Sequence, residues 1–104
     1  MKKHSKHLKT LGNQFISESV KSDYSYNFEW MSRPIIQYPQ DIMAMQELIW
    51  SIKPDLIIET GVAHGGSIIY YASLLNMIGN GTVLGIDIDI RSHNLDALKA
   101  HPLY

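Results

Sequence analysis

The chain has 104 residues, of which 45% are hydrophobic, a formal net charge of −1 and no cysteine. This length allows one domain at most, and the hydrophobic content is sufficient for a core. The balanced charge gives no electrostatic reason to expect nucleic acid or an anionic membrane as a partner. The lack of cysteine excludes a disulfide framework, a thiol nucleophile and a thiolate metal site, and it fits a cytoplasmic protein. No apolar run approaches the roughly 20 residues of a membrane-spanning helix, and no secretory signal is recognisable.

Residues 1–22 are predicted to form a polar N-terminal arm. Their apolar positions have spacings compatible with a weak amphipathic helix, which we expect Gly12-Asn13 to interrupt. These positions are Leu8, Leu11, Phe15, Ile16 and Val20. The basic start of the arm is most simply solvated, and docking to an acidic partner is the alternative.

Residues 23–40 combine several aromatic side chains with Pro34 and Pro39, which bias the residues before them towards extended conformations. The aromatic residues are Tyr24, Tyr26, Phe28, Trp30 and Tyr38. We predict an irregular segment that packs on the domain, with a short strand at Ile35-Ile36. The rings are expected to anchor this segment to the core, and lining a ligand pocket is the alternative.

A helix is predicted from Asp41 to Lys53, because the carboxylate of Asp41 can accept a hydrogen bond from a free amide of the first turn. The apolar residues that follow lie on one helical face at i, i+3, i+7 and i+10. They are Ile42, Met45, Ile49 and Ile52. Pro54 is expected to end the helix.

A strand–helix–strand unit follows. The first strand, Leu56-Ile57-Ile58, lacks the alternation of a half-buried strand and is therefore predicted to be buried on both faces of a parallel sheet. A helix is expected over residues 67–78, where a Gly-Asn-Gly turn ends it. Residues 82–87 are a second short apolar strand, so the connection should be a right-handed crossover. Another helix is expected to start at Ser92 or Asn94.

The turn between the first strand and its helix is rich in glycine. Gly61, Gly65 and Gly66 allow the main chain to approach a ligand closely, since a Cβ atom would push the ligand away. The helix that begins near Ser67 adds free backbone amides at its N-terminus. A plain turn whose glycines only supply positive φ angles is the alternative.

An acidic residue closes each strand: Glu59 stands two residues before Gly61, and Asp87 ends the second strand. Parallel strands end at the same edge of a sheet, so both carboxylates are expected to face one crevice. An acidic residue at the second position commonly binds ribose hydroxyls, because a carboxylate can accept two such hydrogen bonds. Asp89 is a candidate to share this role, and the alternative for both aspartates is a plain solvated position.

The glycine spacing helps to choose the ligand. A dinucleotide fingerprint requires G-x-G-x-x-G, whereas this loop is G-x-x-x-G-G with Ala63 at the position of the second glycine. A close approach of a pyrophosphate is therefore less favoured. The form E-x-G-x-x-x-G is closer to the S-adenosylmethionine loop of class I methyltransferases, usually E/D-x-G-x-G-x-G, from which Ala63 departs by one methyl group. A nicotinamide-dependent oxidoreductase fragment is the alternative.

Several separated motifs carry a more specific resemblance. They include residues 59–67 (ETGVAHGGS), residues 85–91 (GIDIDIR) with the following His93-Asn94, and the segment 30–39. Together they resemble the cephalosporin hydroxylase / rhamnosyl O-methyltransferase family over roughly residues 24–104. The resemblance implies an α/β fold, the N-terminal part of a Rossmann-like class I methyltransferase, with one βαβ unit preceded by helical and irregular segments. Members of this family transfer a methyl group from S-adenosylmethionine to a hydroxyl of a sugar or small molecule.

The resemblance also implies a cofactor-binding set for this chain. In it, Glu59, Gly61 and Gly65 hold the methionine end of S-adenosylmethionine, and Asp87 holds the ribose. His64 either contacts the ligand or only holds the turn. The whole set is Glu59, Gly61, Ala63, His64, Gly65, Ser67, Asp87 and Asp89. The catalytic residues and divalent-metal carboxylates of the family belong to later strands without a counterpart here, so no residue is assigned to either role.

We therefore expect the N-terminal, truncated part of an S-adenosylmethionine-dependent O-methyltransferase, with residues 23–104 as an incomplete Rossmann-like domain. A sheet with two clear strands would leave its edges unpaired and apolar surface bare. A non-catalytic remnant or interaction module that keeps the βαβ unit is the alternative. The expected partners are a small-molecule or sugar substrate and, as an open alternative, further copies in a homo-oligomer.

Overall fold

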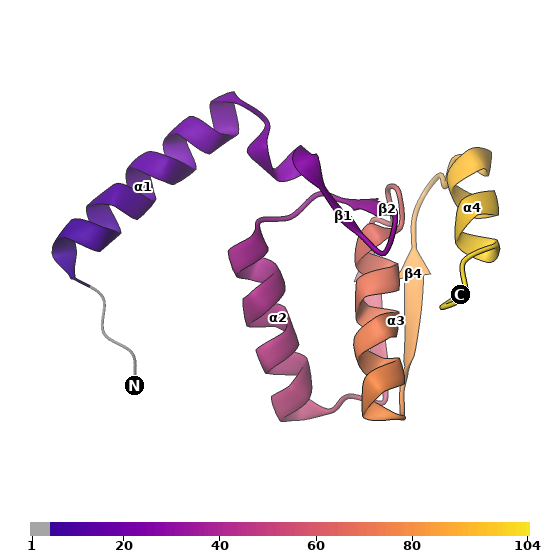
Figure 1. Cartoon of the computed structure of the whole chain (residues 1–104). Helices are drawn as coiled ribbons and strands as arrows, with labels where there is room; N and C mark the ends of the chain where they lie inside the picture. The colour runs from indigo at the N-terminus through magenta and orange to yellow at the C-terminus, as the bar shows by residue number, and fades with distance from the viewer. Residues whose placement is uncertain (1–4) are drawn as a thin grey trace.

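The computed structural model describes residues 5–104, which fold into four α-helices, one 3-10 turn and four short strands (Figure 1). In chain order these are α1 (Lys6–Lys21), η1 (Tyr24–Asn27), β1 (Phe28–Trp30), β2 (Arg33–Ile35), α2 (Pro39–Ile52), β3 (Leu56–Thr60), α3 (Gly66–Ile78), β4 (Thr82–Ile86) and α4 (Ser92–Lys99). Residues 1–4, which hold part of the basic start of the predicted arm, lie outside the described residues. Within residues 5–104 no helix is both long and apolar enough to cross a membrane.

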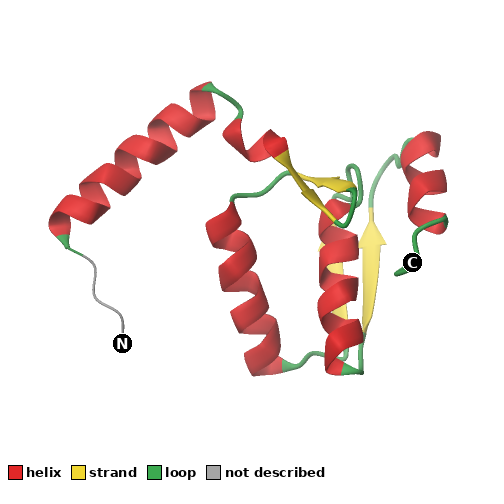
Figure 2. Cartoon of the chain, in the orientation of Figure 1, coloured by secondary structure: helices red, strands yellow, loops and turns green. Residues whose placement is uncertain are grey.

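β3 and β4 pair in parallel, and α3 is the connection between them (Figure 2). The register places Leu56 opposite Thr82 and Thr60 opposite Ile86. The predicted βαβ unit is thus confirmed, and the fold is α/β. Both strands end at the same edge of the sheet, so this edge holds the loop that leads into α3 and the residues that follow β4.

The two faces of the β3–β4 sheet differ in burial. Ile57 and Val83 are half-buried and pack against a core cluster that includes residues of α3. The large apolar side chains of the other face are exposed: Leu56, Ile58, Leu84 and Ile86. The prediction that the first strand is buried on both faces is therefore wrong for residues 5–104, because no second layer covers this face there.

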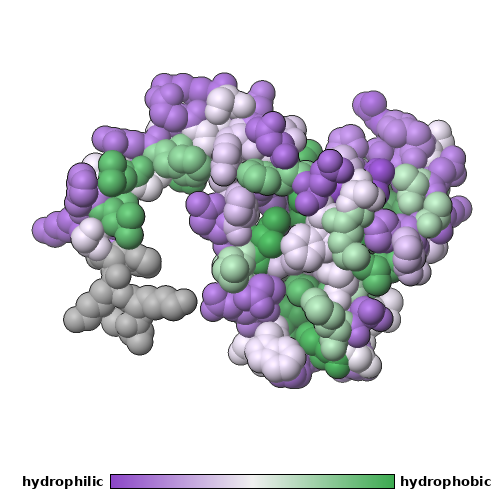
Figure 3. All heavy atoms as spheres, in the orientation of Figure 1, coloured by the Kyte–Doolittle hydropathy of each residue, from purple (hydrophilic) through white to green (hydrophobic). Residues whose placement is uncertain are grey.

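α1 is a continuous helix that extends away from the rest of the chain (Figure 1). Ser5 caps it by accepting a hydrogen bond from the amide of Leu8. The predicted interruption at Gly12-Asn13 is wrong, because a glycine within a helix costs only about 1 kcal/mol. Its larger apolar side chains are exposed and appear as green patches in Figure 3. The hydroxyl of Ser19 connects α1 to the hydroxyl of Tyr38 by a hydrogen bond of 2.7 Å.

A β-hairpin occupies residues 28–35 of the segment 23–40, which was predicted to be irregular. β1 and β2 pair around a two-residue turn, in which Met31 and Ser32 have positive φ angles of 48° and 74°. Such turns usually contain asparagine or glycine, so the sequence signal for this hairpin is missing. The strand predicted at Ile35-Ile36 is correct for its first residue only, because β2 ends at Ile35.

Aromatic side chains anchor the hairpin to α3, as predicted. The ring of Trp30 meets that of Tyr70 edge to face with centroids 4.5 Å apart, and its indole donates a hydrogen bond to the hydroxyl of Ser73. The hydroxyl of Tyr70 in turn donates to the carbonyl of Ile42 on α2. The buried residues of this core are Ile35, Ile49, Tyr70, Tyr71 and Leu75. The hairpin, α2 and α3 therefore form one packed body.

α2 begins at Pro39, with Tyr38 as its N-cap. The prediction of Asp41 as the N-cap is wrong, because a proline at the start of a helix already has a helical φ angle and needs no partner for an amide. Asp41 lies in the first turn instead, where a negative charge suits the helix dipole. Lys53 is the C-cap of the helix and has a φ of 49°. The helix therefore ends before Pro54, as predicted.

Candidate ligand-binding site

The loop of residues 61–65 leads from β3 into α3. Its first amide, that of Gly61, donates to the carbonyl of Ile86 at 2.7 Å and so continues the pairing with β4. Gly61 has a φ of +85°, and the space that a Cβ would occupy is open. On Gly66, by contrast, a Cβ would overlap the carbonyl of Pro34. One glycine therefore leaves room at the loop, and the other lets β2 approach the start of α3.

Asp87 braces this loop from the end of β4. Its Oδ2 accepts hydrogen bonds from the amides of Val62 at 2.8 Å and Ala63 at 3.4 Å, and its Oδ1 accepts one from the amide of Asp89 at 3.2 Å. The hydrogen bond from Val62 is the largest of several that hold the pKa of Asp87 below its ordinary value of 3.8. The carboxylate is therefore ionised at neutral pH. A carboxylate offers about four acceptor positions, and backbone amides of the loop and of the residues after Asp87 occupy most of them.

Ala63 and His64 complete the turn mainly through their backbone. Ala63 has a φ of 49°, in the left-handed region that costs a residue with a Cβ about 1–2 kcal/mol. The side chain of His64 is exposed, and its carbonyl accepts two hydrogen bonds from Arg33. Arg33 was not predicted as a site residue, because nothing in its neighbourhood in the sequence points to residue 64.

Glu59, at the carboxyl end of β3, has a very different environment. Its Oε1 accepts a hydrogen bond from the hydroxyl of Ser67, whereas Oε2 is buried and has no hydrogen-bond partner among residues 5–104. Burial raises the pKa of Glu59, and the hydrogen bond from Ser67 opposes this by lowering it. A buried carboxylate oxygen without a partner is costly. Oε2 is therefore an acceptor that none of the residues 5–104 uses.

A cavity of about 150 Å³ lies at Glu59, between the loop and the segment that follows β2. Its lining is Pro34, Ile35, Ile36, Gln37, Glu59, Gly61, Val62, Ala63, His64, Gly66 and Ser67. It brings together the predicted site residues Glu59, Gly61, Ala63, His64 and Ser67, but not Gly65, Asp87 or Asp89. Gly65 is buried against Leu98 of α4 instead. Residues 34–37 were missed as lining, because their residue types carry no signal for a cavity.

The start of α3 has no side-chain cap. Its N-cap is Gly65, which has no side chain to accept a hydrogen bond from the first amides. These amides and the helix dipole favour an anionic group, whereas Glu59 favours a cationic donor. The two features together suit a ligand that carries both charges on neighbouring atoms, as the free end of an amino acid does.

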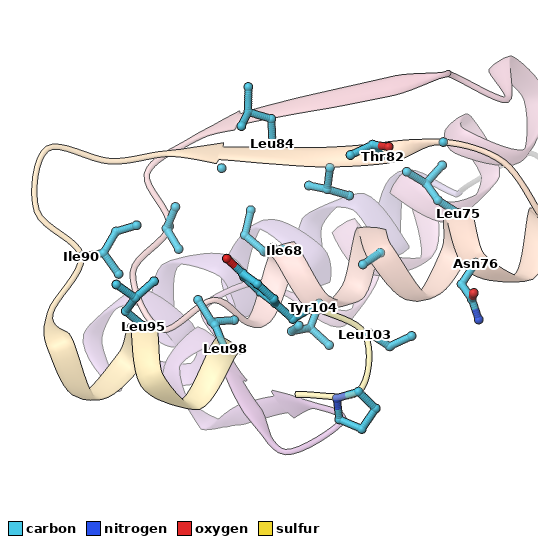
Figure 4. Close-up of a pocket in the computed structure, with 17 residues that line it drawn as sticks. Ile68, Leu75, Asn76, Thr82, Leu84, Ile90, Leu95, Leu98, Leu103 and Tyr104 are labelled. Atoms are coloured by element: carbon cyan, nitrogen blue, oxygen red, sulfur yellow. The ribbon is translucent and has the colours of Figure 1, made fainter. Parts of the chain in front are cut away.

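A larger cavity of about 570 Å³ lies between α3, β4 and α4 (Figure 4). Most of its lining is apolar, including Ile68, Leu75, Leu84, Leu95 and Leu98, and it contains no Asp, Glu or His side chain. This cavity therefore offers mainly packing surface. The smaller cavity at Glu59 remains the candidate site.

A parallel βαβ unit, a glycine-rich loop and an acidic residue at the end of each strand define the N-terminal part of a Rossmann-like class I methyltransferase fold. The chain belongs to the Rhamnosyl O-methyltransferase/CmcI family, whose model matches residues 22–104. The family expected from the sequence motifs is thereby confirmed.

Two relatives show how much of a longer family member this chain matches. The rhamnosyl O-methyltransferase of Mycobacterium leprae (strain TN) is 28% identical over 92 residues, which are 84% of this chain and 40% of that protein. A solved structure named "cmcI-N160 SAH" is 25% identical with a TM-score of 0.58, and the match covers 66% of this chain and 39% of that one. The chain therefore matches about 40% of the length of these relatives.

Proposed function

We propose that this chain binds S-adenosylmethionine at the β3–α3 loop and forms the cofactor-binding part of an O-methyltransferase. The observation that carries the proposal is the buried, unpaired Oε2 of Glu59 next to the uncapped N-terminus of α3. Membership of the family, and a related structure with SAH in its name, support the choice of ligand.

The described residues fit this cofactor. The ammonium group of its methionine end would donate to Glu59, and its carboxylate would meet the amides at the start of α3. A ribose hydroxyl would donate to the carboxylate of Asp87. When bound, S-adenosylmethionine supplies an electrophilic methyl group. Among residues 5–104 no group of three or more His, Cys, Asp or Glu side chains suits a metal ion, and the proposal uses none.

The methyl acceptor belongs to the same proposal. We infer a hydroxyl of a sugar or another small molecule, in keeping with the family to which the chain belongs. A non-catalytic interaction module is the second candidate, and the exposed apolar face of the β3–β4 sheet favours it.

Isothermal titration calorimetry with S-adenosylhomocysteine (SAH), and separately with NAD, tests the ligand. We expect the full chain to bind SAH and not NAD. Gly61→Val should abolish SAH binding, because a branched side chain at a φ of +85° strains the loop and fills open space. Gly12→Ala, at a position without atoms within 4 Å of the added Cβ, is the control and should bind like the wild type.

Two other results would contradict the proposal. Binding of NAD that Asp87→Ala abolishes, without any response to SAH, would indicate an oxidoreductase fragment. Binding of neither ligand by a folded chain would favour the non-catalytic module.

A further inference from the structure

Arg33, the first residue of β2, reaches the β3–α3 loop with its guanidinium group. Its Nε and Nη2 donate to the carbonyl oxygen of His64 at 3.0 and 2.8 Å. Nη2 also donates to Oδ1 of Asn94 on α4 at 3.1 Å, and Asn94 is only 5% exposed. Because the guanidinium group is planar and carries several donors, one side chain connects the hairpin, the loop and α4.

Two groups of opposite charge hold this loop at consecutive residues. Asp87 accepts hydrogen bonds from the amides of Val62 and Ala63, and Arg33 donates to the carbonyl of His64. Between them, Ala63 keeps a φ of 49°, which a residue with a Cβ adopts at a cost. The carboxylate accepts from the amides of Val62 and Ala63, and the guanidinium donates to the carbonyl of the peptide between His64 and Gly65. Together they fix peptide groups on both sides of the peptide between Ala63 and His64.

We propose that Arg33 is a positioning residue that pre-organises the loop for S-adenosylmethionine, and that Asn94 directs its guanidinium group. The inference rests on the proposed function. Arg33 does not line the cavity at Glu59, so it acts through the peptide between His64 and Gly65. Gly65 is the N-cap of α3, and the direction of the free helix amides therefore depends on this peptide. Fixing it before binding reduces the entropy lost when the ligand binds.

Calorimetric titration of the full chain with SAH tests the role of Arg33. Arg33→Gln removes the charged donor and should weaken SAH binding about tenfold. Arg33→Lys keeps the charge without the planar fork and should lose part of that affinity. Asn94→Asp keeps an acceptor for Arg33 and should bind like the wild type, whereas Asn94→Leu should weaken binding. The control is Arg91→Gln, which removes an exposed arginine at the N-cap of α4 and should leave the affinity unchanged.

Amide hydrogen exchange separates positioning from general stability. In free Arg33→Gln the amides of Gly65 and Ile69, which donate to the carbonyls of Val62 and Gly65, should exchange faster than in the wild type, while those of α2 stay unchanged. Saturation with SAH should restore their protection. An Arg33→Gln variant that binds SAH as tightly as the wild type would overturn the inference.

The same exchange data distinguish this inference from the proposed function. If the wild-type chain fails to bind SAH, the proposed function is wrong. Unchanged exchange of Gly65 and Ile69 in Arg33→Gln would then show that Arg33 does not order the loop either.

Discussion

The carboxyl ends of β3 and β4 carry two carboxylates in opposite environments: Glu59 lies within β3 opposite Gly85, and Asp87 follows directly after β4. Glu59 is partly desolvated, has one unpaired buried oxygen, and has a raised pKa. Asp87 accepts hydrogen bonds from the amides of Val62, Ala63 and Asp89 and has a lowered pKa. Position at a strand end therefore does not determine the role of a carboxylate. The number of protein donors around it decides whether it binds a ligand or braces the loop.

The two pKa shifts give opposite dependences of stability on pH. The pKa of Glu59 is raised above its ordinary 4.5, so its contribution to stability declines as the pH rises through the raised pKa. The pKa of Asp87 is lowered below 3.8, so its contribution is present above pH 3.8 and is lost as the pH falls through the lowered pKa. Substitutions that remove the charge of Glu59 or of Asp87 should therefore change stability in opposite directions at neutral pH.

The largest effect on stability is expected at Gly66, where β2 packs against the start of α3. Gly66→Val places a Cβ 2.6 Å from the carbonyl carbon of Pro34, where two backbones meet and neither has a flexible side chain to move. We expect a loss of more than about 3 kcal/mol in the free energy of unfolding, measured by urea denaturation. Gly12→Ala in α1 is the control and should stabilise the chain by up to about 1 kcal/mol. A Gly66→Val chain as stable as the wild type would contradict the packing of β2 on α3.

Asp87→Asn tests whether the carboxylate of Asp87 holds the β3–α3 loop in place. The substitution removes the charge and puts an NH₂ group in place of one acceptor oxygen, opposite backbone amides that need an acceptor. Both the melting temperature and the affinity for SAH should fall. Asp96→Asn, at an exposed position on α4, is the matched control for loss of a carboxylate. An unchanged melting temperature in Asp87→Asn would show that the loop does not depend on this side chain.

Glu59→Gln should separate stability from binding. Removing a buried charge with an unpaired oxygen should raise the melting temperature at neutral pH, because the amide has no charge to desolvate. The affinity for SAH should nevertheless fall about tenfold, because the ligand ammonium loses a charged acceptor. Glu47→Gln, exposed on α2, is the control and should change neither quantity. Lower stability together with unchanged affinity would refute the binding role of Glu59.

The smallest effect is expected at Ala63. Glycine adopts a φ of 49° without the left-handed penalty of alanine, but it also has more freedom in the unfolded chain. Ala63→Gly should therefore stabilise the protein by up to about 1 kcal/mol in urea denaturation. Ala72→Gly, within α3, is the contrast and should destabilise it by about 1 kcal/mol. If both substitutions destabilise the chain equally, the left-handed conformation of Ala63 is incorrect.

The βαβ unit was predictable because its signals are local. Pro54 precedes the first strand, the glycines mark the turn into α3, and Gly79 ends that helix. The parallel pairing then places Glu59 and Asp87 at one edge of the sheet. The sequence was therefore sufficient to locate both carboxylates and most of the loop.

The features that give each carboxylate its role were not predictable, because they depend on contacts distant in sequence. The hairpin turns at Met31-Ser32, a pair without the usual asparagine or glycine. The contacts of Arg33 with His64 and Asn94 join residues 31 and 61 positions apart. Residues 34–37 and Glu59 line one cavity although they are more than 20 positions apart in the sequence.

The pH dependence of SAH binding tests most directly whether ionised Glu59 binds the ligand. Calorimetric titrations of the wild type and Glu59→Gln at several pH values above 4.5 measure whether the ligand needs Glu59 in its ionised form. We predict that the wild-type affinity rises with pH through the raised pKa of Glu59 and then levels off, whereas the affinity of Glu59→Gln is lower and flat. Asp87 stays ionised throughout this range and contributes no slope. Equal pH profiles for the wild type and Glu59→Gln, or no binding of SAH by the wild type, would contradict the binding role of Glu59.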